Sequence, residues 1–145
     1  MPTLYFTALF VVAVMAMVGT KLWLASRQIR FVAAHREQVP SQFTGTIALT
    51  AHQRAADYTI ERTRLTMIEI IVGAAVLIGL TLLGGVQALD LAISDWLGRD
   101  YVGQIALIVA VIAITGVIDL PFDYYRQFVI EQRFGFNRMS RRIFF

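Results

Sequence analysis

Three long apolar runs, at about residues 4–24, 65–83 and 101–120, limit what this chain can fold into. Each run is close to the roughly 20 residues that a helix needs to cross the hydrocarbon core of a bilayer. Lipid offers the backbone no hydrogen-bond partner, so a spanning run must satisfy its own amides as a helix. The sequence therefore predicts an all-α integral membrane helical bundle with three transmembrane helices.

The composition supports a membrane protein, since 57% of residues are hydrophobic and 16% are charged. A soluble core of this length cannot cover so much apolar surface, and the lipid bilayer is the expected partner. The net charge of +3 could indicate nucleic acid binding. However, the basic residues flank apolar runs and no nucleic-acid-binding motif is present, so we expect no nucleic acid partner. The absence of cysteine excludes disulfides and cysteine-ligated metals.

The first run is interpreted as a true span rather than a signal peptide. No Lys or Arg precedes it, and it exceeds the usual length of a signal peptide's apolar region. The polar segment 25–64 follows, and Thr50 and Gln53 have the spacing of a capping box, which predicts a helix start. We expect this helix to continue unbroken into the second span. The whole chain, 1–145, is then one N-terminal transmembrane domain with a long cytoplasmic helical extension before the second span.

Arginine is unevenly distributed between the segments that connect the runs. Segments 25–64 and 121–145 are rich in arginine, whereas 86–100 carries only Arg99. The positive-inside rule places arginine-rich segments in the cytoplasm. We therefore predict a cytoplasmic C-terminus, an N-terminus outside, and a short interfacial helix within the outer segment, from Val86 to Leu97.

Each apolar run contains one ionisable residue: Lys21, Glu69 or Asp119. One hypothesis is that they line a polar cavity between the spans. The favoured hypothesis is that they extend to the membrane interface, with a Lys21–Glu69 or Lys21–Asp119 pair joining two helices. All three residues lie near the predicted cytoplasmic ends of their helices, which favours this second hypothesis. A proton or ion pathway would require charged residues at mid-membrane.

No catalytic or metal-binding residue is identified in this chain. The zinc protease motif H-E-x-x-H places two ligands one helical turn apart, and neither His35 nor His52 lies in such a motif. Both are expected to be solvated loop histidines. The serines lack the Gly-x-Ser-x-Gly context of a nucleophile.

The segment from Leu120 to Asn137 is aromatic, amphipathic and charged. Pro121 is expected to end or kink the third helix, because proline lacks an amide proton and crowds the preceding turn. A juxtamembrane helix and a turn at Gly135 should follow. By its physical character alone, the segment could be an interfacial anchor.

This segment resembles the N-terminal membrane region of the CAAX prenyl protease type I family, which are integral-membrane zinc metalloproteases. The family pattern reads here as Leu120-Pro121-Phe122, then Phe128 to Glu131, then Arg133-Phe134-Gly135-Phe136-Asn137. Earlier similarities are Val39-Pro40 with Phe43, and Ala51-His52-Gln53 with Ala55-Ala56-Asp57-Tyr58-Thr59. The resemblance covers nearly the whole chain in order.

The resemblance implies a membrane protease with a water-filled chamber, a zinc ion in the full-length protein, and peptide or prenylated peptide substrates. It also favours the bacterial inner membrane. The family's catalytic and zinc-binding positions lie beyond Phe145, so none can be assigned here. We expect the chain to be truncated before the catalytic domain, or to be a separately encoded half, with the remaining helices and the catalytic domain as partners. Ser140 and residues 141–145 are typical of the start of another helix.

By this resemblance, the C-terminal segment 121–145, which we call the tail, is expected to have a structural or gate role in admitting peptide substrates. Arg133 is suited to bidentate pairing with a carboxylate. A stand-alone membrane scaffold or interaction subunit without protease activity is the alternative. A small transporter subunit is a weaker reading, because no mid-span charge or broken helix is present. The residues assigned to the structural or gate role are Pro121, Phe122, Glu131, Arg133, Phe134, Gly135, Phe136 and Asn137.

Overall fold

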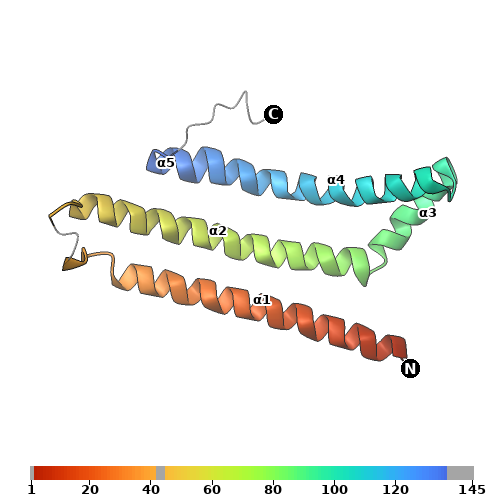
Figure 1. The fold of residues 1–145 in the computed structure, drawn as a ribbon, viewed down its shortest axis with the longest axis horizontal. Coiled ribbons are helices and arrows are strands. Elements are labelled where there is room, and N and C mark those ends of the chain that lie inside the picture. The colour runs from red at the N-terminus through yellow and green to blue at the C-terminus, as the bar shows by residue number, and fades with distance from the viewer. Residues whose placement is uncertain (1, 42–44, 137–145) are drawn as a thin grey trace. The chain divides into compact units, whose positions relative to one another are not determined.

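The computed structural model describes residues 2–41 and 45–136, and every regular element in these ranges is a helix (Figure 1). The prediction of an all-α chain is confirmed. The elements, in chain order, are α1 (Pro2–Ala34), α2 (Leu49–Thr81), α3 (Gly85–Leu97), α4 (Tyr101–Tyr125), the π-helix η2 (Arg126–Glu131) and α5 (Gln132–Phe134).

Three helical stretches in the described part are long and apolar enough to cross a membrane: Thr3–Ala34, Leu49–Thr81 and Tyr101–Phe134. Their large apolar side chains are mostly exposed, as Phe6 and Ile112 illustrate at 71% and 63%. Exposed apolar surface of this extent is unfavourable in water and favourable in lipid. The chain is therefore an integral membrane protein, as predicted.

The helices α1 and α2 are longer than a membrane span requires. Each has 33 residues, which corresponds to roughly 50 Å at the α-helical rise, whereas the hydrocarbon core is about 30 Å thick. The first half of α2 carries all of its charges except Glu69, and these include Arg54, Asp57 and Glu61. The predicted helical extension before the second span is confirmed. The predicted helix start is confirmed to within one residue, because α2 begins at Leu49. The Gln53 side-chain amide donates to Glu37, which is not the contact that a capping box requires.

The predicted short helix between the second and third spans is confirmed as α3. Glycines stand on both sides of it, Gly84 with φ 80° and Gly98 with φ 74°. Residues other than glycine rarely adopt a backbone conformation with positive φ, so glycine at these two positions allows the chain to change direction there. Trp96 and Tyr101, near the end of α3, are 91% and 84% exposed. Such aromatic residues are typical of the membrane interface.

Pro121 does not end the third helix, so that part of the prediction is wrong. It lies inside α4, which continues to Tyr125 and then into the π-helix η2. Membrane helices tolerate an internal proline because neighbouring groups and local changes in pitch satisfy the freed carbonyl. The helical segment ends at Gly135, whose φ of 78° confirms the predicted turn.

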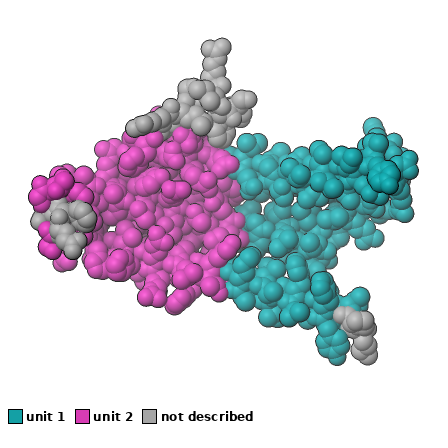
Figure 2. Space-filling view, in the orientation of Figure 1, with its two compact units in different colours: residues 1–18, 71–121 teal, residues 19–70, 122–145 magenta. Residues whose placement is uncertain are grey.

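The chain divides into two compact units, coloured separately in Figure 2. The first unit comprises Met1–Val18 and Ile71–Pro121, and the second comprises Gly19–Ile70 and Phe122–Phe145. Among the described residues of the first unit, few apolar side chains are buried; Val14 is one of them. The second unit contains the one clustered core of the described residues, built around Leu65 and Ile130.

Candidate functional site

Charged and apolar residues recur every four positions along one side of α2. Glu61, Leu65 and Glu69 have this spacing, which places them on one helix face. Arg126, Ile130 and Phe134 have the same spacing in η2 and α5. The first series has an apolar residue between two acidic ones, and the second has a basic residue followed by two apolar ones, so the two series carry opposite charges.

The structure joins these two series in antiparallel order within the second unit. Arg126 donates a hydrogen bond from Nη2 to Oε1 of Glu69. Arg133 donates from Nη1 to Oε1 of Glu61 at 2.6 Å. Leu65, Ile130 and Phe134 pack together between the two ion pairs. We call this arrangement the clasp; its members are Glu61, Leu65, Glu69, Arg126, Ile130, Arg133 and Phe134.

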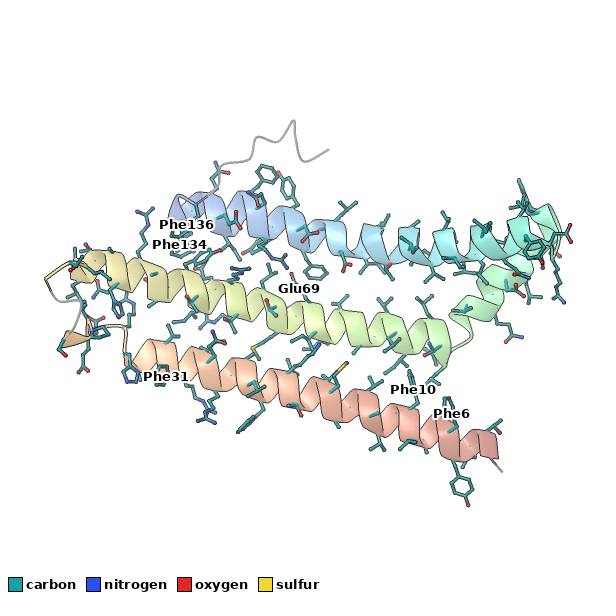
Figure 3. All side chains as sticks on the ribbon, in the orientation of Figure 1. Phe6, Phe10, Phe31, Glu69, Phe134 and Phe136 are labelled. Atoms are coloured by element: carbon teal, nitrogen blue, oxygen red, sulfur yellow. The ribbon has the colours of Figure 1, made fainter. Side chains whose placement is uncertain are left out.

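The centre of the clasp is apolar and closely packed. Ile130 is 1% exposed, and Tyr58 and Phe122 pack against the edge of the cluster. The Tyr58 ring meets the Phe134 ring edge-on, with centroids 5.6 Å apart, and its centroid is 5.0 Å from that of the Phe136 ring. Phe134 and Phe136 are labelled in Figure 3. Tilted aromatic pairs of this kind add to the free energy of burial. The apolar centre therefore holds the tail against α2 in addition to the two ion pairs.

The two ion pairs of the clasp differ in their exposure to solvent. The side chains of Arg126 and Glu69 are 31% and 23% exposed, and Arg126 also binds Asp123 at 3.1 Å. Those of Arg133 and Glu61 are 67% and 32% exposed. Water weakens an exposed ion pair more than a shielded one. The Arg126 end of the clasp should therefore be the stronger end.

A second polar network fixes the start of α2 to the turn after α1. Arg36 donates from Nε and Nη2 to the two carboxylate oxygens of Asp57, at 2.7 and 2.9 Å. Its Nη1 donates to Glu37 at 2.6 Å, and Gln53 donates to the other oxygen of Glu37 at 2.7 Å. Hydrogen bonds to Asp57 and then Glu37 hold the pKa of Arg36 above its ordinary value. The guanidinium therefore stays charged, and its planar fork orients the turn.

The three ionisable residues of the apolar runs lie in different surroundings. Glu69 is bound by Arg126 rather than by Lys21, the partner that the sequence suggested. Lys21 is exposed and lines a groove of the second unit beside Arg62. Asp119 is exposed on α4 and belongs to the first unit.

The structure brings several of the predicted tail residues into the clasp. Arg133 contacts a carboxylate, as expected, although the observed bond to Glu61 is a single one. Phe134 is in the buried cluster, and Phe122 lies at its edge. Pro121 is exposed within α4 and outside the cluster.

The remaining predicted tail residues form or follow the final turn. The Glu131 carbonyl accepts the Phe136 amide proton at 2.8 Å and so closes the turn around Gly135. A Cβ atom at Gly135 would lie 3.2 Å from Nη2 of Arg54, so the guanidinium crowds this turn. Asn137 lies outside the described residues, as do Ser140 and residues 141–145.

The two histidines do not form a metal site. His35 is an exposed turn residue, as expected. His52 is not a loop residue, because it lies in α2 with Nε2 3.0 Å from the carbonyl oxygen of His35. In residues 2–41 and 45–136, no three His, Cys, Asp or Glu side chains gather closely enough to hold a metal ion. The residues described therefore do not fit a zinc ion.

Sequence reasoning did not single out Glu61, Arg126 or Tyr58 as functional residues. A signal was present, because acidic residues share one helix face with Leu65 and a basic residue shares one face with Ile130. The two segments are far apart in the sequence, and Glu69 and Arg126 are separated by 57 positions. The spacing alone does not identify which helices face each other. The packing of Leu65 against Ile130 supplies that information.

The comparisons with known proteins identify the family to which the chain belongs. A family model described as CAAX prenyl protease N-terminal, five membrane helices, matches residues 28–145 and so includes the whole clasp. The CAAX prenyl protease 1 homolog of Dictyostelium discoideum is 42% identical over 33 residues, which are 23% of this chain and 8% of that protein. The chain thus matches only a small part of that relative's length. No solved structure matches the chain. Because the family model covers far more than half of its residues, the chain belongs to the CAAX prenyl protease N-terminal family.

Proposed function

We propose that this chain is the non-catalytic membrane portion of a zinc metalloendopeptidase. In this proposal it forms part of the wall of an intramembrane chamber and a cytoplasmic gate for peptide or prenylated peptide substrates. The main support for this proposal is the clasp. It joins the tail motif of the family, through Arg133 and Phe134, to the part of α2 around the start of the second span. We call the polar part of α2 before that span, residues 49–64, the α2 extension. Zinc and the catalytic groups would belong to the rest of the protease, and the role proposed for this chain does not require it to bind a metal.

The exposed charged residues of the spans are evidence for the proposed role in the chamber wall. Lys21 and Asp119 are exposed although they lie within or close to apolar runs. A charge in contact with hydrocarbon is costly unless water or a polar neighbour reaches it. Further helices of the protease, or water in a chamber, would supply those neighbours.

The difference between the two ends of the clasp is evidence for the proposed gate. The exposed Arg133–Glu61 pair and the turn at Gly135 lie at one end, and the shielded Arg126–Glu69 pair lies at the other. The weaker end would release first, while the stronger end would act as the hinge. The π-helix η2 connects the two ends, and π-helical turns frequently occur at functional sites.

The proposal includes an orientation in the bacterial inner membrane. The N-terminus would be outside, and the α2 extension and the tail would face the cytoplasm. The arginines of these two segments support this orientation through the positive-inside rule.

The test is zinc-dependent peptide cleavage by the purified chain alone and by the same chain joined to, or co-expressed with, the catalytic portion of a family protease from the same organism. We expect cleavage only when both portions are present, and its loss on zinc chelation. A catalytic portion that is folded, zinc-loaded and equally active without this chain would contradict the proposal. A pair that is folded but inactive would favour the stand-alone scaffold.

A further inference from the structure

A groove of the second unit has an unusual concentration of arginine. Its volume is about 510 Å³, within the range of small-ligand pockets. Four arginines and two acidic residues supply its charges: Arg36, Arg54, Arg64, Arg133, Asp57 and Glu61.

The acidic residues of the groove are already neutralised. Asp57 is held by both arms of Arg36, and Glu61 is bound by Arg133. In the part of the chain that the structure describes, no carboxylate pairs with Arg54 or Arg64. Among the described residues, the groove therefore contains two arginines, Arg54 and Arg64, that no carboxylate neutralises.

The positions of these two arginines relate the groove to the membrane. Arg54 and Arg64 share the face of α2 that also carries Asp57 and Glu61, because the intervals are three, four and three residues. Arg64 directly precedes Leu65, where the second apolar run begins. The two arginines are about 15 Å apart along the helix. If the hydrocarbon core begins at Leu65, the groove would extend from that boundary to the depth of the lipid headgroups.

From this placement we infer that the groove binds the phosphate headgroup of an anionic phospholipid. Guanidinium groups match phosphate oxygens geometrically and bind them with charge-assisted hydrogen bonds. Basic pockets beside membrane helices are suited to such headgroups. Arg64 would bind the phosphate at the membrane boundary, and Arg54 and the unused donors of Arg133 would bind the outer part of the headgroup. The inference requires only the described arginines and does not depend on the proposed protease role.

The test measures lipid binding to the full chain, purified in a non-ionic detergent, by native mass spectrometry. The ligands are dioctanoyl phosphatidylglycerol, dioctanoyl phosphatidylcholine and, as a soluble phosphate, glycerol phosphate. The variant is Arg54→Gln/Arg64→Gln. The matched control is Arg27→Gln/Arg62→Gln, which removes the same charge from exposed arginines outside the groove. Circular dichroism checks that both retain their helix content.

We expect phosphatidylglycerol to bind in preference to phosphatidylcholine. The groove variant should bind it about tenfold or more weakly, because charge-assisted hydrogen bonds are lost, whereas the control should bind it normally. Equal weakening in the control would show a general charge effect and overturn the inference. Equal binding of both lipids would overturn it too. Displacement of the lipid by an equal concentration of glycerol phosphate would show that the site takes soluble phosphate rather than lipid.

Discussion

At the scale of single residues, the environment of Glu69 explains how a carboxylate persists in an apolar run. Glu69 lies four residues inside the run that begins at Leu65. An unpaired carboxylate there would be costly, and the Arg126 guanidinium compensates its charge. The same arginine also binds Asp123, so it is held from its own segment as well.

A double-mutant cycle should show the difference between the two ion pairs. For Glu69→Gln and Arg126→Gln we expect a coupling free energy of about 1–2 kcal/mol, since this pair is partly shielded from water. For Glu61→Gln and Arg133→Gln we expect less than about 1 kcal/mol, since this pair is more exposed. Unfolding of each variant by sodium dodecyl sulfate in mixed micelles gives the free energies. Equal coupling in both cycles would contradict the assignment of a strong and a weak end.

At the scale of the helical elements, the clasp depends on packing between α2 and the segment formed by η2 and α5. Ile130 is the most deeply buried of the described core residues, at 1% exposure, whereas its neighbour Val129 is 41% exposed. Both residues lie in η2, so they share its backbone conformation. Their difference in burial makes them a matched pair.

We expect Ile130→Ala to lower the free energy of unfolding by about 2–4 kcal/mol, because it removes buried apolar contacts and leaves a cavity. Val129→Ala should change it by less than about 1 kcal/mol. The same micelle unfolding measurement applies to both variants. If Val129→Ala destabilised the chain as much as Ile130→Ala, the clasp would not be the core of this unit.

The elements could be predicted largely from the sequence, and their contacts could not. Apolar runs of about 20 residues determine the spans, and the glycines near α3 and at Gly135 determine the turns. The end of the third helix could not be predicted, because proline's local penalty suggested an end or a kink at Pro121, and the structure continues the helix into a π-helical segment. The partner of Glu69 was not predictable, since both Lys21 and Arg126 lie near apolar runs and only tertiary packing selects one.

At the scale of the whole molecule, the absence of native cysteine makes the orientation directly measurable. Single cysteines at exposed Gln38 and exposed Asp95 lie in segments predicted on opposite sides of the membrane. In intact cells we expect a membrane-impermeant maleimide to label Asp95→Cys and to leave Gln38→Cys unlabelled until the cells are lysed. The reverse pattern would show that the α2 extension faces outside.

In the proposed function, the exposed end of the clasp is a gate that must open for substrate to enter. The most direct measurement is zinc-dependent peptide cleavage by the complete protease carrying Glu61→Cys and Arg133→Cys, the two residues whose side chains meet at 2.6 Å. A bis-methanethiosulfonate reagent would bridge the two cysteines, and a reductant would release them. We expect bridging to abolish most cleavage and reduction to restore it, whereas each single-cysteine variant should be unaffected by the reagent. Full activity in the bridged protein would contradict the gate and leave the clasp as a fixed part of the wall.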